Sequence, residues 1–233
     1  MSNIRLFLNE KIVKYRSIAL VSEKIHYLRR VMRKHDGYRI TIFNGIEQWD
    51  ATLNLNESAL KPVKRTKVLD FIPDIQMYFG LLKNKQNNYL IEKICEIGVK
   101  KIIPIKTEFS EKFNINHDRF RKIVIEAVEQ SDGIFVPKIE NLTTLENVLD
   151  NWDNERKIFF CDEDREGKKI PKYSLKKTDK VAIFIGPVGG WSEKDKSYFK
   201  YSTINKVSLG TNVLKADTAA IVCLSSLKGL MDA

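Results

Sequence analysis

The chain has 233 residues, 43% of them hydrophobic, which suffices for one large domain or two modest ones and does not indicate disorder. No stretch approaches the roughly 20 apolar residues of a membrane helix, and no apolar signal segment opens the sequence. We therefore expect a cytoplasmic protein that is neither inserted in a membrane nor secreted. Of 40 Lys and Arg against 30 Asp and Glu, 14 basic and 7 acidic side chains fall in residues 1–72. A basic segment suits a polyanion such as a nucleic acid, although a generally basic surface would give the same count.

Short strand-like runs dominate the first 72 residues. They alternate apolar and polar side chains between turn-forming residues, as the strands of a small barrel do. The runs are residues 4–8, 38–43, 48–55 and 63–72. We therefore predict a small β-barrel domain at residues 1–72.

One helix is predicted in this part, at residues 22–34. Ser22 is a suitable N-cap, and Gly37 can take the left-handed conformation that ends a helix. Apolar residues at helical spacing should face the core: Ile25, Leu28 and Met32. The remaining faces carry a basic cluster that could hold RNA backbone or simply be solvated: Arg29, Arg30, Arg33 and Lys34.

From residue 73 onward, apolar strands alternate with helical patterns. The predicted strands are residues 75–82, 100–105, 157–161, 181–185 and 204–209, and the predicted helices are residues 89–97, 120–130, a segment after 192 and a last one ending at 230. This alternation is typical of a parallel sheet covered by helices. We predict an α/β domain at residues 73–233, with ligands at the carboxyl ends of its strands.

The cysteines give no sign of a metal site. Cys95, Cys161 and Cys223 are far apart and have no CxxC or HxxxH spacing. Neither a disulfide framework nor a zinc site is expected, so buried free thiols are the simplest interpretation.

A glycine-rich loop, "IGPVGGWS" at residues 185–192, follows the apolar strand "VAIF" directly. Its glycines permit close backbone approach, and Ser192 with Asp195 resembles a capping box that opens a helix. The loop fits neither a Walker loop nor GxGxxG, and alone it is equally a tight turn. A second segment, "SLGTNVLKADTAA" at residues 208–220, repeats the arrangement, because Gly210 follows a strand and a helix begins at Asp217 or Thr218.

Together these two segments resemble the C-terminal signatures of the bacterial 16S ribosomal RNA uracil-N3 methyltransferases (RsmE type) of the SPOUT class. Residues 91–110, the "EAVEQS" segment at residues 126–131 and "HYLRRVMRKHDGYRITIFNG" at residues 26–45 are also similar to that family. The resemblance covers essentially the whole chain in the right order.

The resemblance implies an α+β protein of two domains: a PUA-like RNA-binding β-barrel at residues 1–72 and a SPOUT domain with a deep trefoil knot at residues 73–233. It implies S-adenosylmethionine as cofactor, a homodimer through the knot, 16S ribosomal RNA within the 30S subunit as substrate, and no metal. The implied cofactor contacts are Phe160, Cys161, Ile185, Gly186, Pro187, Gly189, Gly190, Leu209, Gly210, Val213, Leu214 and Thr218.

The implied reaction moves a methyl group from a sulfonium to a ring nitrogen. Such an enzyme must place uridine N3 in line with the methyl carbon and ease removal of its proton. The sequence does not identify the residue that acts as the base. The resemblance places Glu129, Gln130 and Ser131 nearest the target, with Lys215 as the candidate cation. Asp217 suits a helix N-cap as well as a chemical role.

Several positions depart from the family, in which they usually carry a charge. Val188 stands where Glu is usual, and Arg is usual at the positions of Phe109, Gly133 and Asn212. Backbone-based cofactor binding should survive these changes, whereas contacts to RNA phosphates need not. A SPOUT methyltransferase with another RNA target, or a weakened or inactive RNA-binding relative, are therefore the alternatives.

Overall fold

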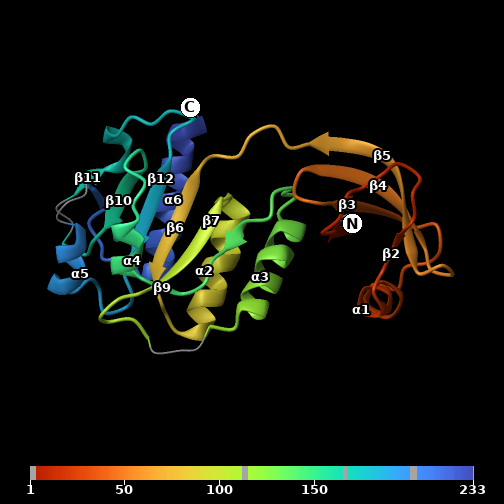
Figure 1. The fold of residues 1–233 in the computed structure, drawn as a ribbon, viewed down its shortest axis with the longest axis horizontal. Helices are drawn as coiled ribbons and strands as arrows, with labels where there is room; N and C mark the ends of the chain where they lie inside the picture. The colour runs from red at the N-terminus through yellow and green to blue at the C-terminus, as the bar shows by residue number, and fades with distance from the viewer. Residues whose placement is uncertain (1–3, 112–114, 165–166, 200–203, 233) are drawn as a thin grey trace. The chain divides into compact units, whose positions relative to one another are not determined.

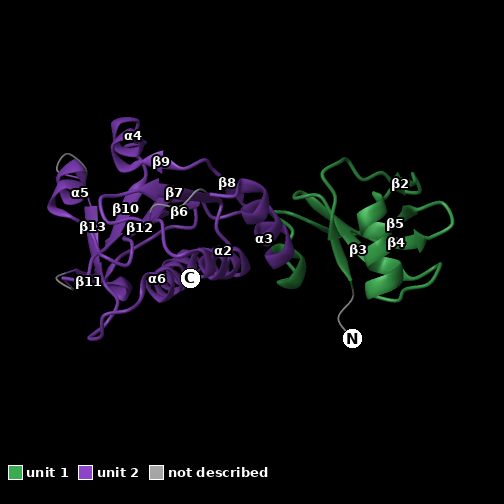
Figure 2. Cartoon of the chain, turned by 90° about the horizontal axis from the view of Figure 1, so that it is seen from below, with its two compact units in different colours: residues 1–71, 128–136 green, residues 72–127, 137–233 purple. Residues whose placement is uncertain are grey.

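The computed structural model describes residues 4–111, 115–164, 167–199 and 204–232. The chain divides into two compact units, of which unit 1 comprises Met1–Phe71 and Val128–Val136, and unit 2 comprises Ile72–Ala127 and Pro137–Ala233 (Figure 2). Among the described residues, none of the helices has the length and apolar character needed to cross a membrane. The segment 128–136 belongs to unit 1, although the sequence assigned it to the second domain.

Unit 1 is built on a five-stranded sheet in the order β1-β3-β4-β5-β2. Its strands are β1 (Arg5–Phe7), β2 (Ile18–Ala19), β3 (Arg39–Phe43), β4 (Glu47–Asn54) and β5 (Ala59–Val68). The alternation in β4 explains its placement, because Trp49, Ala51 and Leu53 are buried while the residues between them are partly exposed. The four predicted strands are present, although β5 begins and ends four residues before the predicted limits of 63–72. The two-residue β2 is too short for a pattern to reveal.

The predicted helix of unit 1 begins at Ser22 as expected, but Ser22 is not its N-cap and its predicted end is wrong. It begins as α1 (Ser22–His26) with Val21 at the N-cap position and no side-chain cap, and it continues as a π-helical turn, η1 (Tyr27–Val31). The Met32 N–H donates to the Tyr27 carbonyl, five residues back, and this wider turn closes the helix. Arg33 then takes a left-handed backbone, with φ of 50°. The helix therefore ends three residues before the predicted end, and Arg33 and Lys34 lie beyond it.

Unit 2 contains a sheet in the order β11-β13-β10-β12-β6-β7-β8, with β9 also paired to β7, and every pair is parallel (Figure 1). The strands are β6 (Ile75–Gly80), β7 (Lys101–Lys106), β8 (Lys138–Ile139), β9 (Thr143–Thr144), β10 (Lys157–Cys161), β11 (Lys168–Lys169), β12 (Val181–Ile185) and β13 (Ile204–Ser208). All five residues of β12 are buried, as its unbroken apolar run predicted for a central strand covered on both faces. The predicted α/β domain with a parallel sheet is confirmed.

Helices cover both faces of this sheet (Figure 2). On one side lie α2 (Asn84–Ile97) and α6 (Ala216–Asp232), and on the other α4 (Leu145–Asp150) and α5 (Glu193–Tyr198); α3 (His117–Gln130) and the short η2 (Ile170–Lys172) complete the set. The helix α2 begins five residues earlier than predicted, because the buried side chain of Asn87 bonds both the N–H and the carbonyl of Leu82 and so fixes its first turn.

Candidate functional site

The main candidate site lies where three neighbouring strands of unit 2 end. In the register of the sheet, Cys161 at the end of β10 lies beside Ile185 of β12 and Val207 of β13. A cavity of about 350 Å³ opens at this edge. The carboxyl ends of parallel strands are where open α/β sheets bind ligands, so the fold and the cavity indicate the same place.

The first wall of the cavity is the loop after β12. Pro187 lies directly against Gly80, since a Cβ on Gly80 would come within 2.7 Å of both the ring Cδ and the backbone N of Pro187. The Gly190 N–H then donates to the Pro187 carbonyl at 3.0 Å, and Gly190 itself has φ of +73°. Only glycine takes this conformation without strain, so the two features fix the loop as a tight turn.

An aromatic side chain and a capping box hold the end of this loop. The Trp191 Nε1–H donates to the Cys161 carbonyl at 2.9 Å, and the indole packs against Phe160 with ring centroids 4.8 Å apart. Ser192 and Asp195 form the predicted capping box at the start of α5. Asp195 is only 3% exposed and also accepts the Glu108 N–H. The loop is thereby tied to the strand on one side and to a helix on the other.

The second wall follows β13. Gly210 has φ of +128° and turns the chain, after which Val213, Leu214 and Lys215 line the cavity before α6 begins. The helix begins at Ala216, so Asp217 lies in its first turn and is not the N-cap that the sequence suggested. Its Oδ1 accepts the adjacent Thr218 N–H at 2.9 Å. This wall is mostly backbone and apolar side chains, with one cation at its end.

The third wall continues from the end of β10 and adds two carboxylates to the cavity. Asp162 is 2% exposed at its side chain and pairs with Lys196 at 2.9 Å, whereas Glu163 is exposed. Cys161 is half-buried, and its thiol lies against that of Cys223 on α6. The hydrogen bond with Cys161, together with complete burial, raises the pKa of the Cys223 thiol. All three cysteines are free thiols, but Cys161 is not fully buried as the sequence suggested.

The cavity collects most of the residues expected to contact a cofactor. Those that line it are Cys161, Ile185, Gly186, Pro187, Gly190, Leu209, Gly210, Val213 and Leu214, and Lys215 lines it too. Phe160, Gly189 and Thr218 do not line it. Phe160 is 2% exposed in the core, a Cβ on Gly189 would meet the Phe109 Cβ at 3.0 Å, and Thr218 is exposed on α6.

Other residues that line the cavity were not predicted from the sequence. They include Gln86 from α2, the pair Asp162 and Glu163, and Trp191, Ala216 and Ala219. The acidic pair carried a signal that could have been used, because it directly follows a predicted strand. Gln86 carried none, since only the fold brings α2 to this edge.

The segment proposed for chemistry, residues 129–131, lies in unit 1. The Phe7 N–H of β1 donates to Glu129 Oε1 at 2.8 Å, and the Lys24 ammonium donates to the Phe7 carbonyl at 2.7 Å. Burial lowers the pKa of Lys24, and the nearby Glu129 carboxylate opposes that shift. Glu129 is therefore engaged in fixing its own segment to β1, while Gln130 and Ser131 are exposed.

Arg5 holds the rest of this segment. Its side chain is only 9% exposed, and its guanidinium donates to Gln48 Oε1 at 2.6 Å, to Asp132 and to the Gly133 carbonyl. Burial lowers the pKa of Arg5, and the carboxylates of Asp132 and Glu129 oppose it. The loop that contains Gly133 is thus bound by an arginine from β1.

The basic cluster of unit 1 is split by the early end of its helix. Arg29 and Arg30 are exposed on η1, and Arg29 also donates to the Leu55 carbonyl at 3.1 Å. Arg33 and Lys34 follow the helix, and the Lys34 ammonium lies 4.3 Å from the centre of the Tyr38 ring. The cluster is a loose basic surface and not one helix face.

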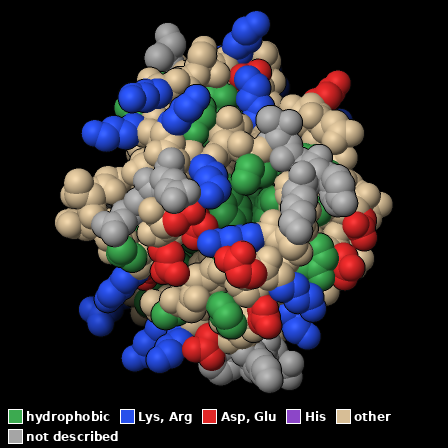
Figure 3. All heavy atoms as spheres, turned by 90° about the vertical axis from the view of Figure 1, so that its left-hand side faces the viewer, with side chains coloured by type: hydrophobic (Ala, Val, Ile, Leu, Met, Phe, Trp, Pro, Cys, Tyr) green, Lys and Arg blue, Asp and Glu red, His purple; other side chains and the backbone are tan. Residues whose placement is uncertain are grey.

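The chemistry of the main cavity suits a nucleoside-like ligand with a charged tail. Its volume lies within the range of small-molecule sites, about 300 to 1,000 Å³. Gly190 and Gly210 let the backbone approach a ligand closely, apolar side chains can cover an adenine, and the carboxylates can meet an ammonium. One face of the molecule shows a hollow of this character, with hydrophobic side chains at its bottom and charges of both signs around it (Figure 3). Among the described residues, no group of three or more His, Cys, Asp or Glu is placed to hold a metal ion.

Comparisons with known proteins point the same way. Residues 71–228 match the profile of the RNA methyltransferase domain. The ribosomal RNA small subunit methyltransferase E of Rickettsia conorii is 26% identical over 239 residues, covering 96% of this chain and 94% of its own. The methyltransferase E 2 of Borreliella burgdorferi is 31% identical over 166 residues, covering 68% and 67%. The solved structure of the Neisseria gonorrhoeae methyltransferase E bound to S-adenosyl methionine has a TM-score of 0.87 at 21% identity, over 99% of this chain and 98% of that one.

Proposed function

Because the chain belongs to the RNA methyltransferase family, whose profile matches residues 71–228, we propose that it methylates N3 of a uridine in 16S ribosomal RNA with S-adenosylmethionine as the donor. The observation that carries the proposal is the cavity at the ends of β10, β12 and β13, with its two turn-built walls. The relatives named as small-subunit ribosomal RNA methyltransferases support the choice of substrate.

The residues of the cavity fit this cofactor. Ile185, Leu209 and Leu214 offer apolar cover for the adenine, and Gly190 and Gly210 let the backbone approach a ligand closely. Glu163 offers a negative charge to the ammonium of the methionine part. When bound, the cofactor supplies an electrophilic methyl group.

The chain's own contribution to the reaction is placement and charge. Uridine N3 must give up its proton, which passes to solvent because no side chain is assigned as the base, before its lone pair can bond to the methyl carbon, so negative charge develops on the uracil ring. The Lys215 ammonium, at the edge of the cavity, would stabilise that charge. Gln130 and Ser131, which the family resemblance assigns to contacts with the uracil, are exposed polar residues of unit 1. Glu129 anchors their segment to β1 by accepting the Phe7 N–H.

The remaining roles follow the family resemblance. We propose that unit 1 is a PUA-like RNA-binding module, with Arg29, Arg30, Arg33 and Lys34 contacting phosphates; that unit 2 contains a SPOUT trefoil knot; and that two copies associate through the knot. The basic surface of unit 1 and the fold-level likeness to the Neisseria enzyme support these assignments. The substrate would be met in the 30S subunit, in the cytoplasm.

Calorimetry tests the cofactor half of the proposal. Titration of the folded protein with S-adenosylmethionine should give saturable binding, and Leu214→Arg, which places a bulky cation in the cavity, should abolish it. Failure of the unaltered protein to bind at high micromolar ligand would reject the cofactor assignment.

The RNA half needs ribosomal RNA from cells. In a strain that lacks the gene, mass spectrometry of 16S ribosomal RNA nucleosides should show 3-methyluridine lost, and re-expression should restore it. An unchanged 3-methyluridine content would reject this substrate. Cofactor binding without that loss would favour another RNA target.

A further inference from the structure

A second cavity, of about 470 Å³, lies elsewhere in unit 2. Gln76 and Tyr78 of β6 and Lys101 of β7 form part of its wall, and α4 with the chain that follows it forms another part through Asn147 and Trp152. It shares no lining residue with the cavity at the strand ends. The proposed methyl transfer uses none of its side chains.

Aromatic rings form one side of this second cavity. Tyr78 stacks on Phe184 with ring centroids 4.5 Å apart and planes inclined by 6°. Trp152 leans on both rings, 5.9 Å from Tyr78 and 5.7 Å from Phe184. Trp152 is half-buried, so the indole is anchored by the stack while part of its surface remains open to a ligand.

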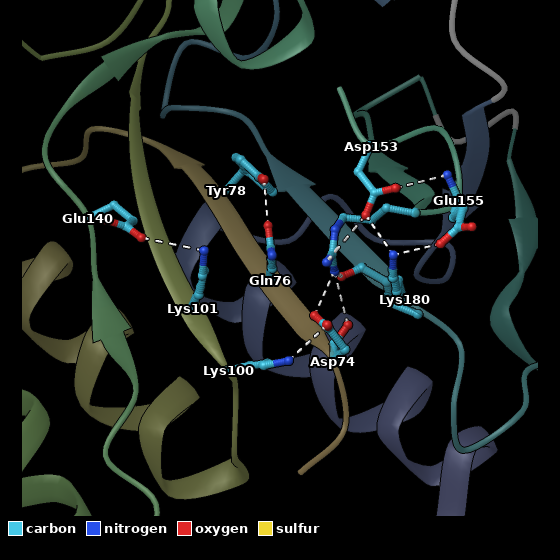
Figure 4. Close-up of polar contacts among 11 residues, drawn as sticks. Asp74, Gln76, Tyr78, Lys100, Lys101, Glu140, Asp153, Glu155 and Lys180 are labelled. Atoms are coloured by element: carbon cyan, nitrogen blue, oxygen red, sulfur yellow. Dashed lines mark hydrogen bonds and ion pairs between the residues drawn. The ribbon is translucent and has the colours of Figure 1, made fainter. Parts of the chain in front are cut away.

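The charges around the cavity are already neutralised. Lys101 lies 3.6 Å from Glu140, which also pairs with Lys138 at 2.7 Å, and Arg156 pairs with Asp74 at 2.8 Å. Figure 4 shows the Gln76–Tyr78 pair between the Lys101–Glu140 pair on one side and the group around Asp153 and Lys180 on the other. No charge of one sign dominates, which disfavours a phosphate or carboxylate ligand.

Neutral donors are what remain available. The Tyr78 hydroxyl donates to Gln76 Oε1 at 2.7 Å, which leaves the Gln76 NH₂ group as the outward part of the amide. Burial raises the pKa of Tyr78 to about 12, so this hydroxyl keeps its proton at neutral pH. Within the part of the chain that the structure describes, neither that NH₂ group, nor the Asn147 side-chain amide, nor the Trp152 indole N–H has a hydrogen-bond partner.

We propose that this cavity binds a nucleobase, an uncharged planar ring that contacts Trp152 and accepts a hydrogen bond at a carbonyl or ring nitrogen from the Gln76 amide. Aromatic contact with a few neutral donors is how proteins bind single bases. The base can belong to a free nucleoside or to single-stranded RNA, because both present the same ring. The site is separate from the cofactor cavity, so its test does not depend on whether the proposed methyl transfer is correct.

Nuclear magnetic resonance of the full chain tests the proposal. The Trp152 indole N–H signal, assigned with Trp152→Phe, should shift saturably when uridine or adenosine is added at millimolar concentration. Gln76→Leu should weaken this binding about 3- to 10-fold, the effect of losing one hydrogen bond. The matched control is Val188→Ala, an exposed change in the other cavity, which should leave the affinity unchanged.

The two sources of the base are separated with an oligouridylate. Tighter binding of the oligomer than of uridine, lost in Gln76→Leu, would identify single-stranded RNA as the ligand, and equal binding would identify the free nucleoside. The absence of any shift, a nucleoside affinity unchanged in Gln76→Leu, or displacement of the nucleoside by S-adenosylmethionine would overturn the proposal. Among the residues that the structure describes, the Gln76 side chain bonds only to Tyr78, so its variant should fold even if changes at Trp152 do not.

Discussion

The two cavities of unit 2 are built in opposite ways. The cavity at the ends of β10, β12 and β13 owes its shape to backbone turns and small or apolar residues, whereas the second one is lined largely by polar side chains from several separate segments. Turns need particular residue types at fixed spacing, so the first cavity leaves a motif in the sequence. Polar side chains that meet only in the fold leave none. The difference predicts distinct responses to mutation.

The largest effect is expected on stability, at Arg156 beside the second cavity. Its guanidinium is 7% exposed and bonds Asp74 and the Val181 carbonyl, so Arg156→Met removes a nearly buried ion pair. Breaking such a pair costs about 3 kcal/mol, which urea unfolding would measure. Lys180→Met, which breaks only surface pairs, is the control and should change little. The affinity for S-adenosylmethionine should be the same in both variants as in the unaltered protein. A loss of affinity in both variants would show that the two cavities are not independent.

The next effect concerns the backbone-built cavity. Gly80→Ala places a Cβ within 2.7 Å of Pro187, so the loop after β12 must move. Overpacking of this kind costs about 1–3 kcal/mol, or about 5- to 150-fold in affinity for S-adenosylmethionine. Gly229→Ala on α6 is the matched control, because its added Cβ meets nothing within 4 Å. Calorimetry that found the same affinity in both variants would show that the Pro187 turn does not shape the site.

A smaller effect is expected at Trp191. Trp191→Phe keeps an aromatic ring against Phe160 but removes the hydrogen bond from Nε1 to the Cys161 carbonyl. Losing one hydrogen bond costs about 0.5–1.5 kcal/mol of stability, so the unfolding midpoint should fall by a few degrees. Because this bond also holds the wall of the cavity, cofactor affinity should fall about 3- to 10-fold. Trp152→Phe in the second cavity should leave cofactor affinity unaltered. If Trp152→Phe lowered cofactor affinity and Trp191→Phe did not, the assignment of the cofactor to the first cavity would be contradicted.

The smallest effect is a pH dependence at Asp74. Burial alone would raise the pKa of Asp74, but the hydrogen bonds and charges of Arg156 and Lys100 together hold it below its ordinary value. The folded state therefore binds this proton less readily than the unfolded state. The resulting stability is present above about pH 4 and is lost as the pH falls further. Asp74→Asn should reduce the loss of unfolding free energy between pH 5 and pH 3, and an identical acid profile would exclude this contribution.

Much of unit 2 could be predicted because its signals are local. The strands β10 and β12 have the predicted limits, and the Ser192–Asp195 capping box forms as its spacing indicated. The family resemblance is confirmed by the profile match over residues 71–228. These features depend on residues that are neighbours in the chain, where spacing alone decides which groups can meet.

The misses depend on contacts between distant residues or on backbone detail. Glu129 could not be recognised as a partner of Phe7, because only the fold brings α3 to β1. The helix after Ser22 ends early because a π-turn replaces a regular one, and residue types do not determine that choice. The Gln76–Tyr78 pair beside Trp152 has no sequence signature, so the second cavity could not be predicted from the sequence.

The most direct test of the central claim is transfer of a labelled methyl group from S-adenosylmethionine to purified 30S subunits and to free 16S ribosomal RNA in parallel. We expect label to appear in RNA as 3-methyluridine and to vanish in the Leu214→Arg variant. Folded protein that binds the cofactor but labels neither substrate would contradict the assignment and would favour an inactive RNA-binding relative.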